Sequence, residues 1–215
     1  MTTRQTIVSQ GIRLEYLTIG WNCMEAVVAM VSGLIAGSIA LVGFGIDSVI
    51  EVSSGAILLW RLGADQAQSS ERAEHVAVRL VGAGFLVLAT YVTYDALSSL
   101  VRHEAPEKSV VGIVLAILSL IVMPMLAHAK RRVALGLGSG AMRADSRQTD
   151  ICAYLSAILL GGLVLNALFG WWWADPVAGL IMVPLIAYEG IEAVQGKTCC
   201  AEPACGKELV DEHRG

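Results

Sequence analysis

Asp47 and Glu51 lie four residues apart within an otherwise apolar stretch of the sequence. On a helix this spacing puts both carboxylates on one face, about 6 Å apart along the axis. Two acids placed in this way repel each other unless a cation or a proton lies between them. We identify no lysine or arginine in the apolar stretches that is positioned to neutralise both. The pair therefore predicts a bound metal ion or a shared proton, and the alternative is a structural hydrogen-bonded pair.

A second set of polar residues recurs in a later apolar stretch, at spacings of three, four and four that place them on one helix face. This stripe comprises Asp145, Gln148, Cys152 and Ser156. Counted from the expected helix ends at about 1.5 Å per residue, Glu51 and Cys152 both lie about 16–18 Å deep and could meet at one level. Carboxylate, amide and thiolate ligands together suit a divalent ion such as zinc better than magnesium. The alternative for Gln148 and Cys152 is a small polar contact between helices.

Three further acids within apolar stretches are secondary candidates. Glu25 could form a structural hydrogen bond or relay protons, and Asp145 shares the stripe described above. Asp150 lies about 200° around the helix from Gln148 and Cys152, on another face. Near the end of the chain stand three cysteines, Cys199, Cys200 and Cys205. In the cytoplasm their thiols would stay reduced, and both a soft-metal site and unused thiols remain open for them.

The composition shows what kind of protein must position these groups. Of the 215 residues, 55% are hydrophobic and only 16% are charged, with a mean hydropathy of +0.64. Soluble domains carry about a quarter charged residues. A disordered chain, a collagen and a disulfide-rich secreted scaffold are excluded. The net charge of −4 and the scattered basic residues argue against nucleic-acid binding. An integral membrane protein remains.

Six apolar stretches have about the 20 residues or more that a membrane span needs. They fall at residues 14–37, 39–62, 76–101, 110–129, 145–170 and 176–194. We therefore expect an all-α polytopic membrane protein with six transmembrane helices. Its expected parts are a cytoplasmic N-terminal segment of residues 1–13, a six-helix transmembrane domain of residues 14–196 and a short cysteine-containing cytoplasmic tail of residues 197–215.

Local signals mark the ends of some spans. Gly37 and Ser38 are expected to form a tight turn between the first two spans. Asp175 followed by Pro176 is typical of a helix start, with the acid as N-cap and proline at the first helical position.

The positive charges predict the orientation in the membrane. If both termini are cytoplasmic, thirteen of the fifteen lysines and arginines lie on the cytoplasmic side, including those in the run 130–132. Only Arg102 and Lys108 then lie outside. This is a strong positive-inside bias. We predict cytoplasmic termini, and the inner membrane of the cell as the location.

Over about residues 14–195, the chain resembles the cation diffusion facilitators. Members of that family carry Asp-x-x-x-Asp or His-x-x-x-Asp on helix two and His-x-x-x-Asp on helix five, and the four residues form the transport site, usually for zinc. Here residues 47–51 read Asp-Ser-Val-Ile-Glu, with glutamate in place of the second aspartate. The sequences at 33–40 and 171–176 are also similar to the family's. The resemblance is greatest to short members that lack the cytoplasmic metal-binding domain. In place of a histidine-rich loop between helices four and five, this chain has the basic run 130–132.

The fifth helix departs further from the family pattern. A gapless alignment puts Gln148 and Cys152 at the family's histidine and aspartate, whereas a shifted one puts Ser146 and Asp150 there. We prefer the gapless alignment because both flanking segments and the polar stripe agree with it. Histidine is the usual side chain that titrates near neutral pH. Without it, proton coupling would depend on the carboxylate pair.

The resemblance implies a transporter that exports a divalent transition metal, with zinc expected, in exchange for protons. Access would alternate around a midplane site, and the protein would act as a homodimer in the lipid bilayer. The alternative is a membrane-embedded metal sensor or accessory protein without turnover. We expect no enzyme and no resident cofactor. The sequence lacks the serine–histidine pair, the His-Glu-x-x-His motif and the aspartate dyad of intramembrane enzymes.

Overall fold

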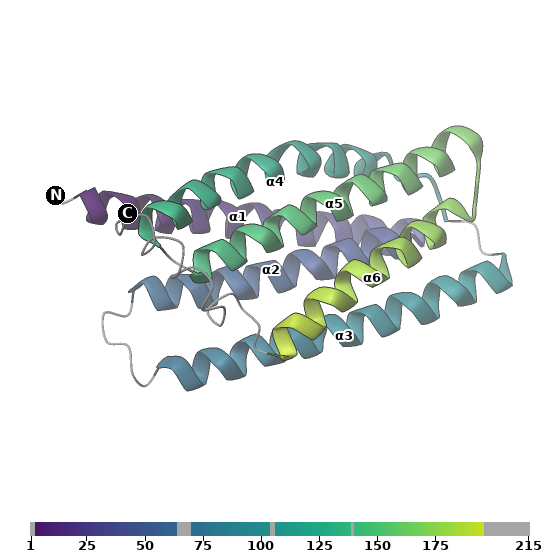
Figure 1. Cartoon of the computed structure of the whole chain (residues 1–215). Coiled ribbons are helices and arrows are strands. Elements are labelled where there is room, and N and C mark those ends of the chain that lie inside the picture. Colours follow the sequence, from purple (N-terminus) through teal and green to yellow (C-terminus); the bar gives the residue numbers. More distant parts are fainter. Residues whose placement is uncertain (1–2, 64–69, 104–105, 139, 196–215) are drawn as a thin grey trace, which may run out of the picture.

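The computed structural model describes residues 3–63, 70–103, 106–138 and 140–195. These residues form six helices and no strand, which confirms the predicted all-α fold (Figure 1). The helices are α1 (Thr3–Ala36), α2 (Ile39–Gly63), α3 (Ser70–Arg102), α4 (Val110–Leu137), α5 (Gly140–Phe169) and α6 (Ala174–Val194). Successive helices run in opposite directions along one elongated bundle (Figure 1). We call the end at which α1 begins and α4 ends the N-terminal end of the bundle.

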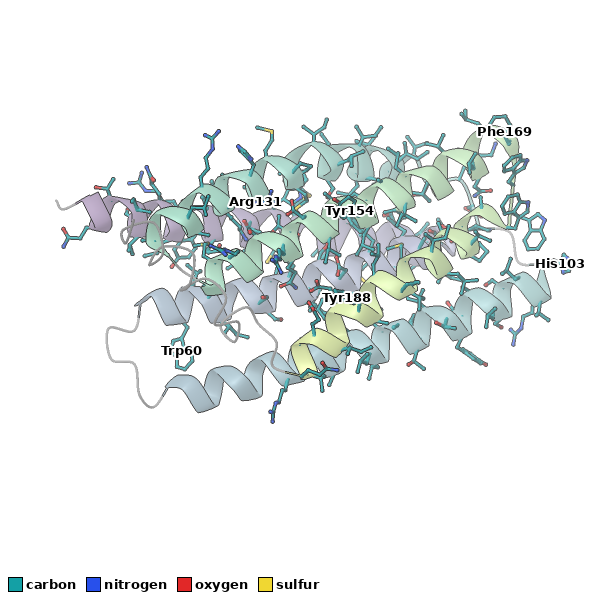
Figure 2. All side chains as sticks on the ribbon, in the orientation of Figure 1. Trp60, His103, Arg131, Tyr154, Phe169 and Tyr188 are labelled. Atoms are coloured by element: carbon teal, nitrogen blue, oxygen red, sulfur yellow. The ribbon has the colours of Figure 1, made fainter. Side chains whose placement is uncertain are left out.

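The surface of the bundle suits a lipid environment. Each helix contains a segment long and apolar enough to cross a membrane. Large apolar side chains face outward on several helices, among them Ile35, Val87, Ile121 and Leu168. Aromatic side chains lie near both ends, where interfacial rings belong: Trp60 near one, His103 and Phe169 at the other (Figure 2). The chain is a multi-pass membrane protein, as predicted.

The helices extend beyond several predicted spans, most clearly at the N-terminal end. Helix α1 begins at Thr3 instead of at residue 14, and α4 continues to Leu137 instead of ending at residue 129. Gly138 closes α4 in the left-handed conformation, with φ of 61°. The basic run 130–132 therefore belongs to a helix, and the prediction of a loop there was wrong. The predicted span ended at residue 129 because Lys130 is strongly hydrophilic, but other helices bury this lysine.

The turn between α1 and α2 is held by a residue from the far end of the sequence. Gly37 has φ of +64°, which glycine adopts without strain. Asp175 accepts hydrogen bonds from Ser38 Oγ at 2.5 Å and from the Ile39 backbone N–H at 2.9 Å. The prediction that Asp175 caps its own helix was wrong, because α6 begins at Ala174 and Trp173 is its N-cap. Asp175 instead caps α2 and fastens α6 to the turn.

Helices α1 and α2 pack with their backbones nearly in contact. A Cβ atom on Gly45 would lie 2.9 Å from Cγ and 3.0 Å from the backbone nitrogen of Met30. A Cβ atom on Gly33 would likewise lie 2.9 Å from the backbone nitrogen of Val42. Small residues allow this approach in membrane bundles. The close approach brings polar residues of α1 next to the acidic face of α2.

Candidate cation site

The predicted acids of α2 and the thiol of α5 lie together inside the bundle. Asp47, Glu51 and Cys152 are 5%, 2% and 1% exposed. The Cys152 thiol lies within interaction range of both carboxylates. Glu25 of α1 and Glu189 of α6 add further negative charge around Asp47. The structure therefore brings together three of the four predicted ligands, in surroundings rich in acids.

Several carboxylate oxygens in this region are buried without a partner. Glu51 Oε1 accepts a hydrogen bond of 2.8 Å from Thr149 Oγ1, and Glu25 Oε2 accepts one of 3.2 Å from Ser48 Oγ. Among the described residues, neither Glu51 Oε2 nor Glu25 Oε1 has a hydrogen-bond partner. Unsatisfied buried polar atoms are rare and unfavourable. Oxygens of this kind are available to a proton or to a cation.

Gln148, the fourth predicted ligand, makes no hydrogen bond with the other three among the described residues. Its side chain is half-buried. Thr149, the next residue, faces Glu51 instead. Across the residues that the structure describes, no group of three or more His, Cys, Asp and Glu side chains is arranged to hold a metal ion. The candidate site is thus a set of neighbouring ligands and not a formed coordination shell.

The residues of the alternative alignment of α5 have other partners. Ser146 Oγ donates a hydrogen bond of 2.8 Å to the backbone oxygen of Arg143 in its own helix. Asp150 forms a part-exposed ion pair with Arg131. Asp150 therefore lies away from Asp47 and Glu51, and the geometry favours Cys152 over Asp150 as the partner of α2.

Sequence reasoning missed a buried ion cluster next to this site. Lys130 is completely buried, and its Nζ donates to Glu15 Oε2 at 3.2 Å and to Asp145 Oδ2 at 2.5 Å. The same nitrogen lies 3.4 Å from Thr149 Oγ1, which in turn donates to Glu51. Asp145, a secondary metal candidate, is therefore paired with a lysine. One hydroxyl group links the ion cluster to the acids of α2.

The position of Lys130 corrects one expectation from the sequence. We expected no basic residue near the acidic pair, but the Lys130 ammonium interacts with Glu51. A signal was present, because the lysine continues the buried face of α4 at helical spacing. That face comprises Ser119, Met123, Ala127, Lys130 and Ala134. On α1 the corresponding buried polar stripe is Glu15, Thr18, Asn22 and Glu25.

Two predictions lie outside what the structure describes. Cys199, Cys200 and Cys205 fall beyond the described residues, so their role remains a prediction. The same holds for the tail of residues 197–215 as a separate part of the chain.

The chain is similar in sequence to several known proteins. The chain is 28% identical over 153 residues to an uncharacterized transporter of Synechocystis, covering 68% of this chain and 49% of the relative. It is 26% identical over 189 residues to transmembrane protein 163 of Xenopus laevis, covering 87% and 67%. An uncharacterized transporter of Methanocaldococcus jannaschii is 26% identical over 178 residues, covering 80% and 62%. The chain thus spans between about half and two thirds of the length of these relatives.

The family assignment covers the helical bundle. Residues 17–195 match the cation efflux transmembrane domain, a range that begins within α1 and ends just after α6. Asp47, Glu51, Cys152, Lys130 and Asp145 fall inside it, whereas Glu15 lies two residues before its start. Because the match extends over most of the sequence, the chain belongs to the cation efflux transmembrane domain family.

Proposed function

We propose that this protein carries divalent transition-metal cations across the membrane, with zinc as the first candidate, in exchange for protons. The observation that supports the proposal is the meeting of Asp47, Glu51 and Cys152 inside the bundle of a cation efflux domain. Two relatives are named as transporters, though their substrates are not. The proposed direction is outward from the cytoplasm.

The ligand types support a transition metal over magnesium or calcium. Thiolate sulfur binds borderline and soft ions, whereas magnesium and calcium take oxygen ligands almost exclusively. Asp47 and Glu51 supply carboxylate oxygens, and Cys152 supplies the sulfur. A fourth ligand completes the tetrahedral shell that zinc prefers, and Gln148, one turn before Cys152, is our candidate. A rotation of α5 would bring it toward Glu51.

Proton exchange follows from the crowding of acids. Neighbouring buried carboxylates cannot all stay charged without a counter-ion. A metal ion that binds between them therefore displaces protons, and its release requires that protons return. Alternating access would expose the same ligands first to one side of the membrane and then to the other. We propose a homodimer as the working form, by resemblance to the family.

Flux into sealed vesicles tests the proposal. The full chain is reconstituted with a metal-sensitive dye inside, and uptake of Zn²⁺, Co²⁺ and Mg²⁺ is followed with and without a pH gradient. We expect Zn²⁺ and Co²⁺ flux, accelerated by a gradient that supplies counter-protons, and no Mg²⁺ flux. Flux indifferent to the gradient would refute antiport. Tight Zn²⁺ binding without flux would refute transport and favour a membrane-embedded sensor or accessory protein.

A further inference from the structure

Among the lysines and arginines whose side chains the structure describes, Lys130 is the one that is fully buried. It lies seven residues before the end of α4, about 10 Å along the axis from that end. A lysine this close to a helix end usually extends its ammonium group to the membrane surface. The adjacent Arg131 and Arg132 are exposed in this way. Lys130 instead points inward, toward acids from two other helices.

In the described part of the chain, the Lys130 ammonium group leaves one oxygen of each partner carboxylate without a hydrogen bond. Glu15 and Asp145 contribute two carboxylates to one ammonium group, and they lie close enough to interact with each other. Glu15 is completely buried and Asp145 is 4% exposed. Among the described residues, Glu15 Oε1 and Asp145 Oδ1 have no hydrogen-bond partner. Two carboxyl groups thus share one ammonium group, and two of their buried oxygens are open to a second cation.

The cluster also lies on the side of the candidate site nearer the N-terminal end of the bundle. Asp145 is in the second turn of α5, and Cys152 is two turns further along. Thr149 lies between them and contacts both Lys130 Nζ and Glu51. An ion that reached Glu51 from the N-terminal end would meet Asp145 and Glu15 first.

We propose that Glu15 and Asp145 form a second cation site and that the Lys130 ammonium group is its built-in competitor. In the metal-free protein Lys130 occupies the site. A divalent cation displaces the ammonium, binds the two carboxylates and passes to Glu51 by way of Thr149. The transfer to Glu51 rests on the proposed transport function, but the binding of a cation by Glu15 and Asp145 does not.

Zn²⁺ binding to the purified full chain tests the competition. Isothermal titration calorimetry compares wild type with Lys130→Gln, which removes the charge, and Lys130→Arg, which keeps it. We expect Lys130→Gln to tighten Zn²⁺ binding at this site by at least about tenfold, because unit charges a few ångströms apart interact strongly even at an effective dielectric constant of about 20. Lys130→Arg should resemble wild type. The tighter binding should disappear when Asp145→Asn is added to Lys130→Gln. Unchanged Zn²⁺ affinity in a well-folded Lys130→Gln protein would overturn the proposal.

A double variant separates this proposal from the transport proposal. In Lys130→Gln combined with Asp47→Asn, the Glu15–Asp145 site should still bind Zn²⁺ tightly, because Asp47 is not part of it. Loss of all Zn²⁺ binding in that double variant would overturn the second site. If Asp47→Asn alone changes neither flux nor binding, the transport site is wrong, whereas the effect of Lys130 remains measurable.

Labelling of the unaltered chain gives an answer even if the variants do not fold. Lys130 acetylation by an amine-reactive reagent is quantified by mass spectrometry with and without Zn²⁺, and the exposed Lys108 serves as the internal control. Displacement by Zn²⁺ should raise labelling of Lys130 several-fold and leave Lys108 unchanged. Equal or lower labelling of Lys130 with Zn²⁺ would contradict the proposal.

Discussion

Replacing Thr149 with valine removes the hydroxyl group that connects α5 to Glu51 of α2. Thr149 is completely buried, and its Oγ1 donates to Glu51 Oε1 at 2.8 Å. Valine has nearly the same shape, so packing is retained while one oxygen of a buried carboxylate loses its donor. The contact with Lys130 Nζ, at 3.4 Å, is too long to contribute much.

The expected loss of stability follows from the charge on the acceptor. A hydrogen bond to a charged group contributes about 1.5–3 kcal/mol. In a chain of about 150–250 residues each kcal/mol shifts the melting temperature by about 2–4 °C, so Thr149→Val should lower it by about 3–12 °C. Thr149→Ser keeps the hydroxyl group and should recover most of the loss.

Thermal unfolding of the detergent-purified protein, followed by tryptophan fluorescence, measures this effect. Thr93→Val is the matched control, because Thr93 donates only to the backbone oxygen of Ala89, one turn earlier in its own helix. The control should change the free energy of unfolding by no more than about 0.5 kcal/mol. A melting temperature for Thr149→Val equal to that of Thr93→Val would refute the view that this hydroxyl couples α5 to α2.

Three further changes test other parts of the account. Cys152→Ser replaces a soft ligand by a hard one, so the ratio of Cd²⁺ to Mn²⁺ flux should fall, and an unchanged ratio would argue against sulfur in the site. Asp175→Ala removes two hydrogen bonds at the start of α2 and should destabilise the protein by about 1–2 kcal/mol in thermal unfolding, whereas no change would mean that this cap is dispensable. Removal of residues 197–215 should raise the metal concentration for half-maximal flux and keep the maximal rate, and a lost maximal rate in a folded protein would place the tail cysteines within the transport cycle.

The number and type of the helices could be predicted, because the thickness of a bilayer fixes the length of an apolar span. The helix ends could not be predicted equally well. Lys130 marks the end of an apolar segment by composition, yet α4 continues for seven residues. Its charge is matched by Glu15 and Asp145 from α1 and α5, partners that hydropathy within a single segment does not reveal. Asp175 was misassigned for the same reason, since its partner lies 137 residues away.

The candidate site shows a similar limit. The four-residue spacing and the depth count were enough to place Asp47, Glu51 and Cys152 near one another. They were not enough to choose between Gln148 and Thr149, which are about 100° apart on the helix. Packing decides the rotation of α5. The buried face is Asp145, Thr149, Cys152 and Ser156, and the last of these donates a 3.0 Å hydrogen bond to Ser119 of α4.

Zn²⁺ flux through Asp47→Asn, compared with Asp150→Asn, tests the central claim most directly. Both changes remove one carboxylate from the bundle with almost no change in size, but Asp47 lies 5% exposed beside Glu51 and Cys152, whereas Asp150 pairs with Arg131 at a part-exposed position. With equal amounts of folded protein in vesicles, Asp47→Asn should abolish Zn²⁺ flux and Asp150→Asn should retain it at close to the wild-type rate. The opposite ranking would contradict the account and place the transport site at Ser146 and Asp150.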